Sequence, residues 1–299
     1  MYVILGVMVV TMVVLWSQRG KVAESEVRRL VGRGGLPAEV ELVASATEWF
    51  RQRQTILVLG ILAGTVAAGV ALFVADAVSG GELQLGPAFG EESFEFTVDL
   101  RLLAWFLAIT AACGGVATLL HGYRAVRLAR VEGPRSAALR PRKLGDYLNP
   151  IEIAIYYVIV AVPLICIGLG VVVLGSADHP QRGWVLVASG GIAVLMWGGG
   201  LLLQRLALGV SQASGRPEQL LWQEALRAAT LRDIGTAMIT TSWLLGAAVP
   251  ASFTWPSDVP GSFTWMGLGL FMAALALSML ASAVAYSPWG LQRVRRVVG

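Results

Sequence analysis

Residues 153–174 read IAIYYVIVAVPLICIGLGVVVL, a stretch without a single charged side chain. An apolar stretch of this length is typical of a transmembrane α-helix. It lacks the strict alternation of polar and apolar residues that a membrane β-barrel strand requires. The stretch therefore predicts a helix that crosses the bilayer and satisfies its backbone N–H and C=O groups internally.

Six further apolar segments flank this one, and they are 2–16, 55–78, 102–120, 184–203, 235–253 and 263–286. At about 1.5 Å per residue, all except the first can cross a hydrocarbon core of roughly 30 Å. We interpret the short first segment as an uncleaved anchor, because it lacks a basic leader and a small-residue cleavage site. An interfacial or cleaved segment is the alternative. The expected fold class is all-α, a polytopic transmembrane helix bundle with six or seven spans.

Composition and charge indicate the same class and an orientation. Of all residues 56% are hydrophobic and 14% charged, which is too little charge to coat a soluble globule of 299 residues. All of the 23 Lys and Arg residues except Arg101 and Arg182 fall in residues 17–54, 121–152 and 205–232 or in the tail from Arg293. By the positive-inside rule we expect these connections and the C-terminus in the cytoplasm and the N-terminus outside.

We expect two parts in the chain. Residues 1–54 form an N-terminal anchor helix plus a basic amphipathic cytoplasmic stretch, and residues 55–299 form a six-helix transmembrane domain with cytoplasmic loops 121–152 and 205–233. The expected location is the plasma membrane, as a multi-pass protein. Its first partner is the lipid bilayer, with anionic lipids at the cytoplasmic face contributing about 1 kcal/mol per nearby cation. We expect no nucleic-acid binding, because the cations follow one membrane face without an aromatic-and-basic platform.

The run 218–232 after Pro217 places apolar residues on one side and polar residues on the other. We interpret it as a short amphipathic helix on the inner leaflet, with Trp222 at headgroup depth. Packing against the protein's own helices, or docking of a soluble partner, are the alternatives.

No arrangement of residues points to catalysis. Cys113 and Cys166 lie inside predicted spans, and His121 and His179 lie on opposite sides of the membrane in the expected topology. Nucleophile elbows, phosphate-binding loops, metalloprotease pairs and dinucleotide fingerprints do not occur in the sequence. We therefore expect no enzymatic activity, no catalytic residues, no cofactor and no metal site.

Two sets of residues are candidate functional sites. The first is a cytoplasmic interaction surface joined by ion pairs, with plain topology-determining charges as the alternative. It comprises Arg142, Lys143, Asp146, Tyr147, Glu224, Arg227, Arg232 and Asp233. The second set would line the route of a permease, although hydroxyls in spans also bond to the carbonyl one turn back. It comprises Pro163, Thr236, Thr240, Thr241, Ser242 and Pro250.

The segment LRPRKLGDYLNP at 139–150 and the segment EALRAATLR at 224–232 carry a resemblance. They resemble an actinobacterial family of multi-pass integral membrane proteins that have no assigned activity, in which similar stretches precede two of the spans. The resemblance implies a membrane fold and no particular chemistry.

The expected function is that of a non-enzymatic integral membrane protein. It would act through a membrane-protein partner, as an accessory or regulatory component of a membrane or export complex. The alternative is a permease or transporter for an uncharged or amphipathic solute.

Overall fold

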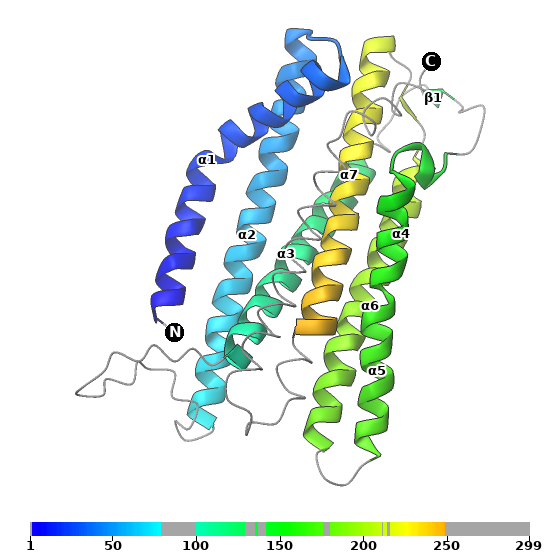
Figure 1. Ribbon diagram of the computed structural model, residues 1–299. Coiled ribbons are helices and arrows are strands. Elements are labelled where there is room, and N and C mark those ends of the chain that lie inside the picture. Colours follow the sequence, from blue (N-terminus) through cyan, green and yellow to red (C-terminus); the bar gives the residue numbers. More distant parts are fainter. Residues whose placement is uncertain are drawn as a thin grey trace.

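The computed structural model describes residues 2–78, 100–128, 135–136, 142–175, 180–210, 212–213 and 216–248. These residues are almost entirely helical (Figure 1), as the sequence predicts. The predicted span 263–286, the acidic loop 79–99, His179 and Pro250 lie outside the described residues.

Seven α-helices, one 3₁₀ turn, one π-helical turn and two short strands make up the described chain. The α-helices are α1 (Tyr2–Gly34), α2 (Val40–Val78), α3 (Leu100–Leu128), α4 (Pro150–Ile159), α5 (Ala161–Leu174), α6 (Pro180–Gly209) and α7 (Pro217–Trp243). The 3₁₀ turn is η1 (Leu144–Asp146) and the π turn is η2 (Leu244–Ala248). Strands β1 (Arg135–Ser136) and β2 (Gln212–Ala213) pair antiparallel.

Four helical segments are long and apolar enough to cross a membrane. They are Val40–Ala71, Trp105–Arg127, Pro150–Leu174 and Gly183–Gly209. These segments overlap the second to fifth predicted spans, and their length and composition fit a helical membrane protein. The predicted sixth span begins at Gly235 in α7. The described residues end at Ala248, before the predicted end of this span at residue 253.

Several helices are longer than the predicted segments, and α1 and α2 exceed them most. The anchor 2–16 continues through the basic stretch as one helix, α1. Similarly, α2 begins at Val40 and runs without interruption past residue 54, where we divided the chain. The expected boundary between the two parts therefore lies inside a continuous helix.

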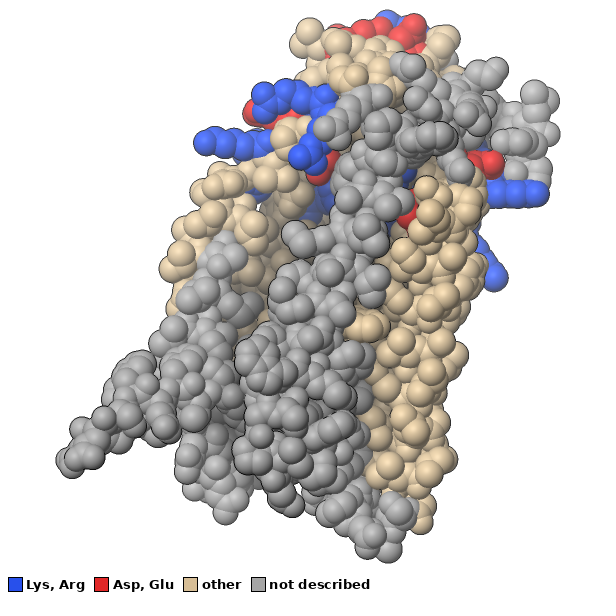
Figure 2. Space-filling model, in the orientation of Figure 1, with Lys and Arg blue, Asp and Glu red and all other residues tan. Residues whose placement is uncertain are grey.

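Most charged side chains that the structure describes gather at one end of the bundle. The C-termini of α1, α3 and α6 and the N-termini of α2, α4 and α7 meet there (Figure 1). The blue and red side chains in Figure 2 lie at this end, while the described helices below it show an uncharged surface. We call it the inner end.

Away from the inner end, glycines bring the helices into backbone contact. A Cβ atom on Gly64 of α2 would lie 2.8 Å from the Cβ of Cys113 in α3, and one on Gly60 would overlap Ala117. Between α5 and α6, a Cβ on Gly190 would lie 2.8 Å from the carbonyl oxygen of Pro163. Small residues at these contacts allow the close packing that drives helix association in lipid.

The amphipathic run 218–232 does not lie free on a leaflet. It forms the first half of α7, and its Trp222 is 3% exposed, with the indole N–H donating to the carbonyl of Pro37 at 3.0 Å. The inner-leaflet interpretation is therefore wrong, and the run packs on the protein's own helices. One buried cluster comprises Ala23, Val27, Leu30, Leu36, Ala46, Phe50, Trp222 and Ala225.

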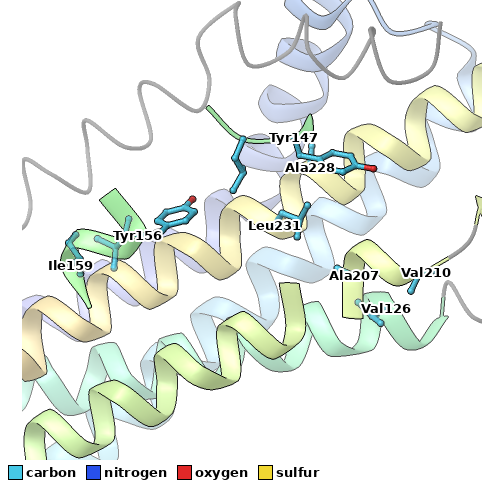
Figure 3. Packing of buried hydrophobic residues seen from close by; sticks show 10 residues of the cluster. Val126, Tyr147, Tyr156, Ile159, Ala207, Val210, Ala228 and Leu231 are labelled. Atoms are coloured by element: carbon cyan, nitrogen blue, oxygen red, sulfur yellow. The ribbon is translucent and has the colours of Figure 1, made fainter. Parts of the chain in front are cut away.

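A second buried cluster joins α3, α4, α6 and α7 to the segment before α4 (Figure 3). It includes Val126, Tyr147, Tyr156, Val210 and Leu231. Both clusters include residues of the inner half of α7, so this half of the helix links them.

Candidate functional site

Glu224 lies at the centre of a polar network within the inner end. Its side chain is 1% exposed and accepts from three side chains. The Tyr147 hydroxyl donates at 2.6 Å, Arg227 at 2.7 Å, and Arg142 approaches to 3.2 Å. Both arginines also donate to the carbonyl of Val210, at 3.0 and 2.9 Å. One carboxylate thus connects α7, the end of α6 and the segment before α4.

A second ion pair continues the network along α7. The Arg232 guanidinium lies 3.8 Å from Glu152 of α4 and donates to the Tyr147 carbonyl at 3.4 Å. The Glu152 side chain is 2% exposed. It also accepts from the backbone N–H of Asn149 at 2.7 Å, which caps α4.

A third pair joins α7 to α2. Arg53 donates to Asp233 at 2.5 Å, and the two side chains are 17% and 12% exposed. His121 of α3 is also buried here and meets the edge of the Trp49 ring, with centroids 5.0 Å apart. Each acid of the network is therefore paired with an arginine, so no carboxylate is buried without a countercharge.

Local sequence places the segment 142–149, which we call the strap. Asp146 accepts from the backbone N–H of Lys143 at 2.8 Å and closes the turn η1. Asn149 then caps α4, with Pro150 in the first turn and Glu152 completing the capping box. The closed turn η1 and the cap of α4 bury Tyr147 and direct its hydroxyl to Glu224.

All eight residues of the predicted interaction surface lie at the inner end. Arg142, Tyr147 and Arg227 each contact Glu224 directly, and Arg232 and Asp233 extend the network. Lys143 is exposed and Asp146 is half-buried in η1. The six residues of the network face the interior, so they shape this end from within.

We did not single out three partners in this network. Glu152 could have been found from its place three residues after Asn149, which is the capping-box spacing. Arg53 could have been found only by extending α2 toward the inner end. The role of Val210 could not have been predicted from the sequence, because its backbone carbonyl is the acceptor and any residue at this position could supply one.

Burial shifts the pKa of Tyr147 and of Asp233. Burial, with the hydrogen bond to Glu224, raises the pKa of Tyr147 to about 12. Burial also raises the pKa of Asp233, and the neighbouring Arg53 opposes this rise. Tyr147 therefore keeps its proton as a donor to Glu224 over the physiological range.

The predicted route-lining residues are packed rather than open. Thr241 is fully buried and donates to the Ala237 carbonyl of its own helix, while Ser242 is fully buried beside it. Thr236 and Thr240 are half-buried. Pro163 packs against Gly246, where an added Cβ would lie 3.1 Å from the proline nitrogen.

Within the described ranges, no three His, Cys, Asp or Glu side chains group as metal ligands. Comparison with known proteins finds no matching family model, and neither a curated protein nor a solved structure of significant similarity.

Proposed function

We propose that this chain is a non-enzymatic, multi-pass protein of the plasma membrane that acts through association with other membrane proteins. It would serve as an accessory or regulatory component of a membrane or export complex. The observation that carries the proposal is the inner network, in which buried charges hold the strap, α2, α4 and α7 in one fixed arrangement.

The charge-free lengths of the helices support the membrane position. Uncharged residues fill the intervals between Arg53 and Asp76, between Arg101 and Arg124, and between Arg182 and Arg205. Each interval is about 22 residues, or roughly 33 Å of helix, which matches a hydrocarbon core. The cations at the inner ends of these intervals support an inner end in the cytoplasm, beside anionic headgroups.

The exposed surface of the helices supports the same placement. Leu195 of α6 is 76% exposed, Val172 of α5 72% and Phe73 of α2 67%. Side chains of this kind are favourable against lipid tails or against another membrane protein, and unfavourable in water.

The pairing of each acid of the network with an arginine supports a role in shape rather than in chemistry. Buried ion pairs contribute little net stability, because desolvation offsets their attraction. They do select one arrangement of the elements that carry them. A chain that holds its inner end this way can present a constant surface, with Lys143 and Arg216 exposed, to a partner.

Native mass spectrometry of the protein, extracted from its membrane into polymer-bounded lipid discs, tests this proposal. The wild-type chain should be found in a complex heavier than one chain. The double variant Arg142→Gln with Arg227→Gln, which leaves Glu224 without cations, should lose that complex while keeping its helix content.

The control is Glu48→Gln, which removes the exposed pair with Arg51 at the same end and should keep the complex. Recovery of the wild-type chain only as a single, partner-free species would contradict the proposal.

A further inference from the structure

Two parallel helices depart from regular α geometry where they touch each other. The helix that begins at Pro150 is interrupted at Val160, where α4 ends and α5 begins, and Pro163 follows within one turn. The helix α7 gives way to the π turn η2 at Leu244. Pro163 of the first interruption packs directly on Gly246 of the second.

Backbone hydrogen bonding is weakened at the first interruption, and a side chain contacts the backbone of the second. Pro163 has no N–H, so the carbonyl of Ile159 loses its partner one turn later. The next N–H, that of Leu164, reaches the Val160 carbonyl at a long 3.5 Å. In η2 the Cys166 thiol contacts the carbonyl of Gly246. A side chain one turn after the first interruption thus contacts a backbone group of the second.

The inner parts of the same two helices are joined firmly. Arg232 of α7 pairs with Glu152 of α4, and the Tyr156 ring lies directly on the backbone of Gly235, where an added Cβ would overlap it. These contacts tie α4 to the inner half of α7, while Pro163 and Cys166 tie α5 to η2. The junctions at Val160 and at Leu244 lie between these two tied pairs.

Regular helices resist bending, and sharp changes of direction occur at prolines and π turns. Two such sites at one contact can bend only together, because Pro163 and Gly246 leave no space between them. We propose that Val160–Pro163 and Leu244–Ala248 form one coupled hinge. At this hinge α4 and the inner half of α7 swing as a unit relative to α5.

The hinge couples displacements at the inner end to the angle between helices within the membrane. A partner that displaces the strap or α7 at the inner end changes the angle at the interruptions. This inference does not depend on the proposed function, since it concerns how two helices move and not what binds them.

Spin labels on the helix α4–α5 and a substitution on η2 test the coupling in lipid nanodiscs. In a Cys113→Ala, Cys166→Ser background, labels at the exposed residues Ile151 and Val172 measure the end-to-end distance across the first interruption. The variant Gly246→Ala places a methyl group against Pro163. It should shift the measured distance distribution, because a change in the helix kink changes the angle between the two labelled arms.

The matched control is Gly198→Ala in α6, where an added Cβ meets nothing within 4 Å, and it should leave the distance unchanged. An unchanged distance in folded Gly246→Ala would overturn the coupled hinge.

If Gly246→Ala does not fold, Pro163→Ala is tested with labels at Arg216 and Val172, which report the swing of inner α7 against outer α5. A shift supports the hinge, and the wild-type distance contradicts it. Pro150→Ala, a proline in the first turn of the same helix where no hydrogen bond is lost, is the control.

Discussion

Gly60 in α2 and Glu224 in α7 both lie in contacts between helices, but the contacts are of opposite kinds. Around Gly60 the backbones of α2 and α3 touch, because a Cβ on Gly60 would already meet Ala117, the Cys113 carbonyl oxygen and the Gly114 Cα. Around Glu224 the elements are held apart by long side chains that reach one carboxylate.

The difference follows from the solvent of each region. Lipid tails are as apolar as leucine, so helices in the membrane gain from close packing and dispersion. At the inner end, water and headgroups can solvate charged groups, and arginine stems can cross the interface. A failure of packing in the first region should separate helices, while a failure of pairing in the second should release the strap.

The largest effect should come from Glu224→Ala. Removal of this buried carboxylate leaves Arg142 and Arg227 without a countercharge, which should cost about 3–5 kcal/mol of stability. Thermal unfolding in detergent checks this, with Glu48→Ala as the exposed control expected to cost less than about 1 kcal/mol. Equal losses in the two variants would show that the network adds nothing to the inner end.

A smaller loss should follow Gly60→Ala. The added Cβ would overlap Ala117 and lie 3.1 Å from the Cys113 carbonyl oxygen, so α2 and α3 must separate at a cost of about 1–3 kcal/mol. Gly69→Ala in the same helix meets nothing within 4 Å and should be neutral or slightly stabilising. If both variants melt at the wild-type temperature, glycine contacts do not hold this region.

Trp222→Phe should cost about 1 kcal/mol, because it removes the hydrogen bond to the Pro37 carbonyl while keeping most of the apolar ring. Proteolysis between α1 and α2 should become faster in this variant, since Trp222 fixes that connection. Proteolysis at the wild-type rate would indicate that the apolar cluster alone holds α1 and α2 on α7.

A further effect concerns pH. Because the folded state raises the pKa of Tyr147 to about 12, its contribution to stability is complete below about pH 10 and is lost as the pH rises toward 12. The wild-type protein should lose more stability between pH 10 and 12 than Tyr147→Phe does. Parallel stability curves for the two proteins would contradict the buried donor.

Hydropathy and charge alone predict the helices, because a span needs little more than length and the lack of charge. The same signals place the predicted cytoplasmic loops 121–152 and 205–233 together at one end. They do not predict that 218–232 is the start of α7, since an amphipathic face fits lipid and protein equally well. Nor do they predict the pairing of Arg53 with Asp233, which depends on how α2 lies against α7.

The position of the inner end in the cytoplasm is the claim on which the proposed function depends, and thiol labelling tests it most directly. In a chain without native cysteines, Arg216→Cys and Gly86→Cys are exposed to an impermeant maleimide on intact cells. The account predicts labelling at position 86 and, until the membrane is opened, none at position 216. Labelling at 216 with none at 86 would contradict it.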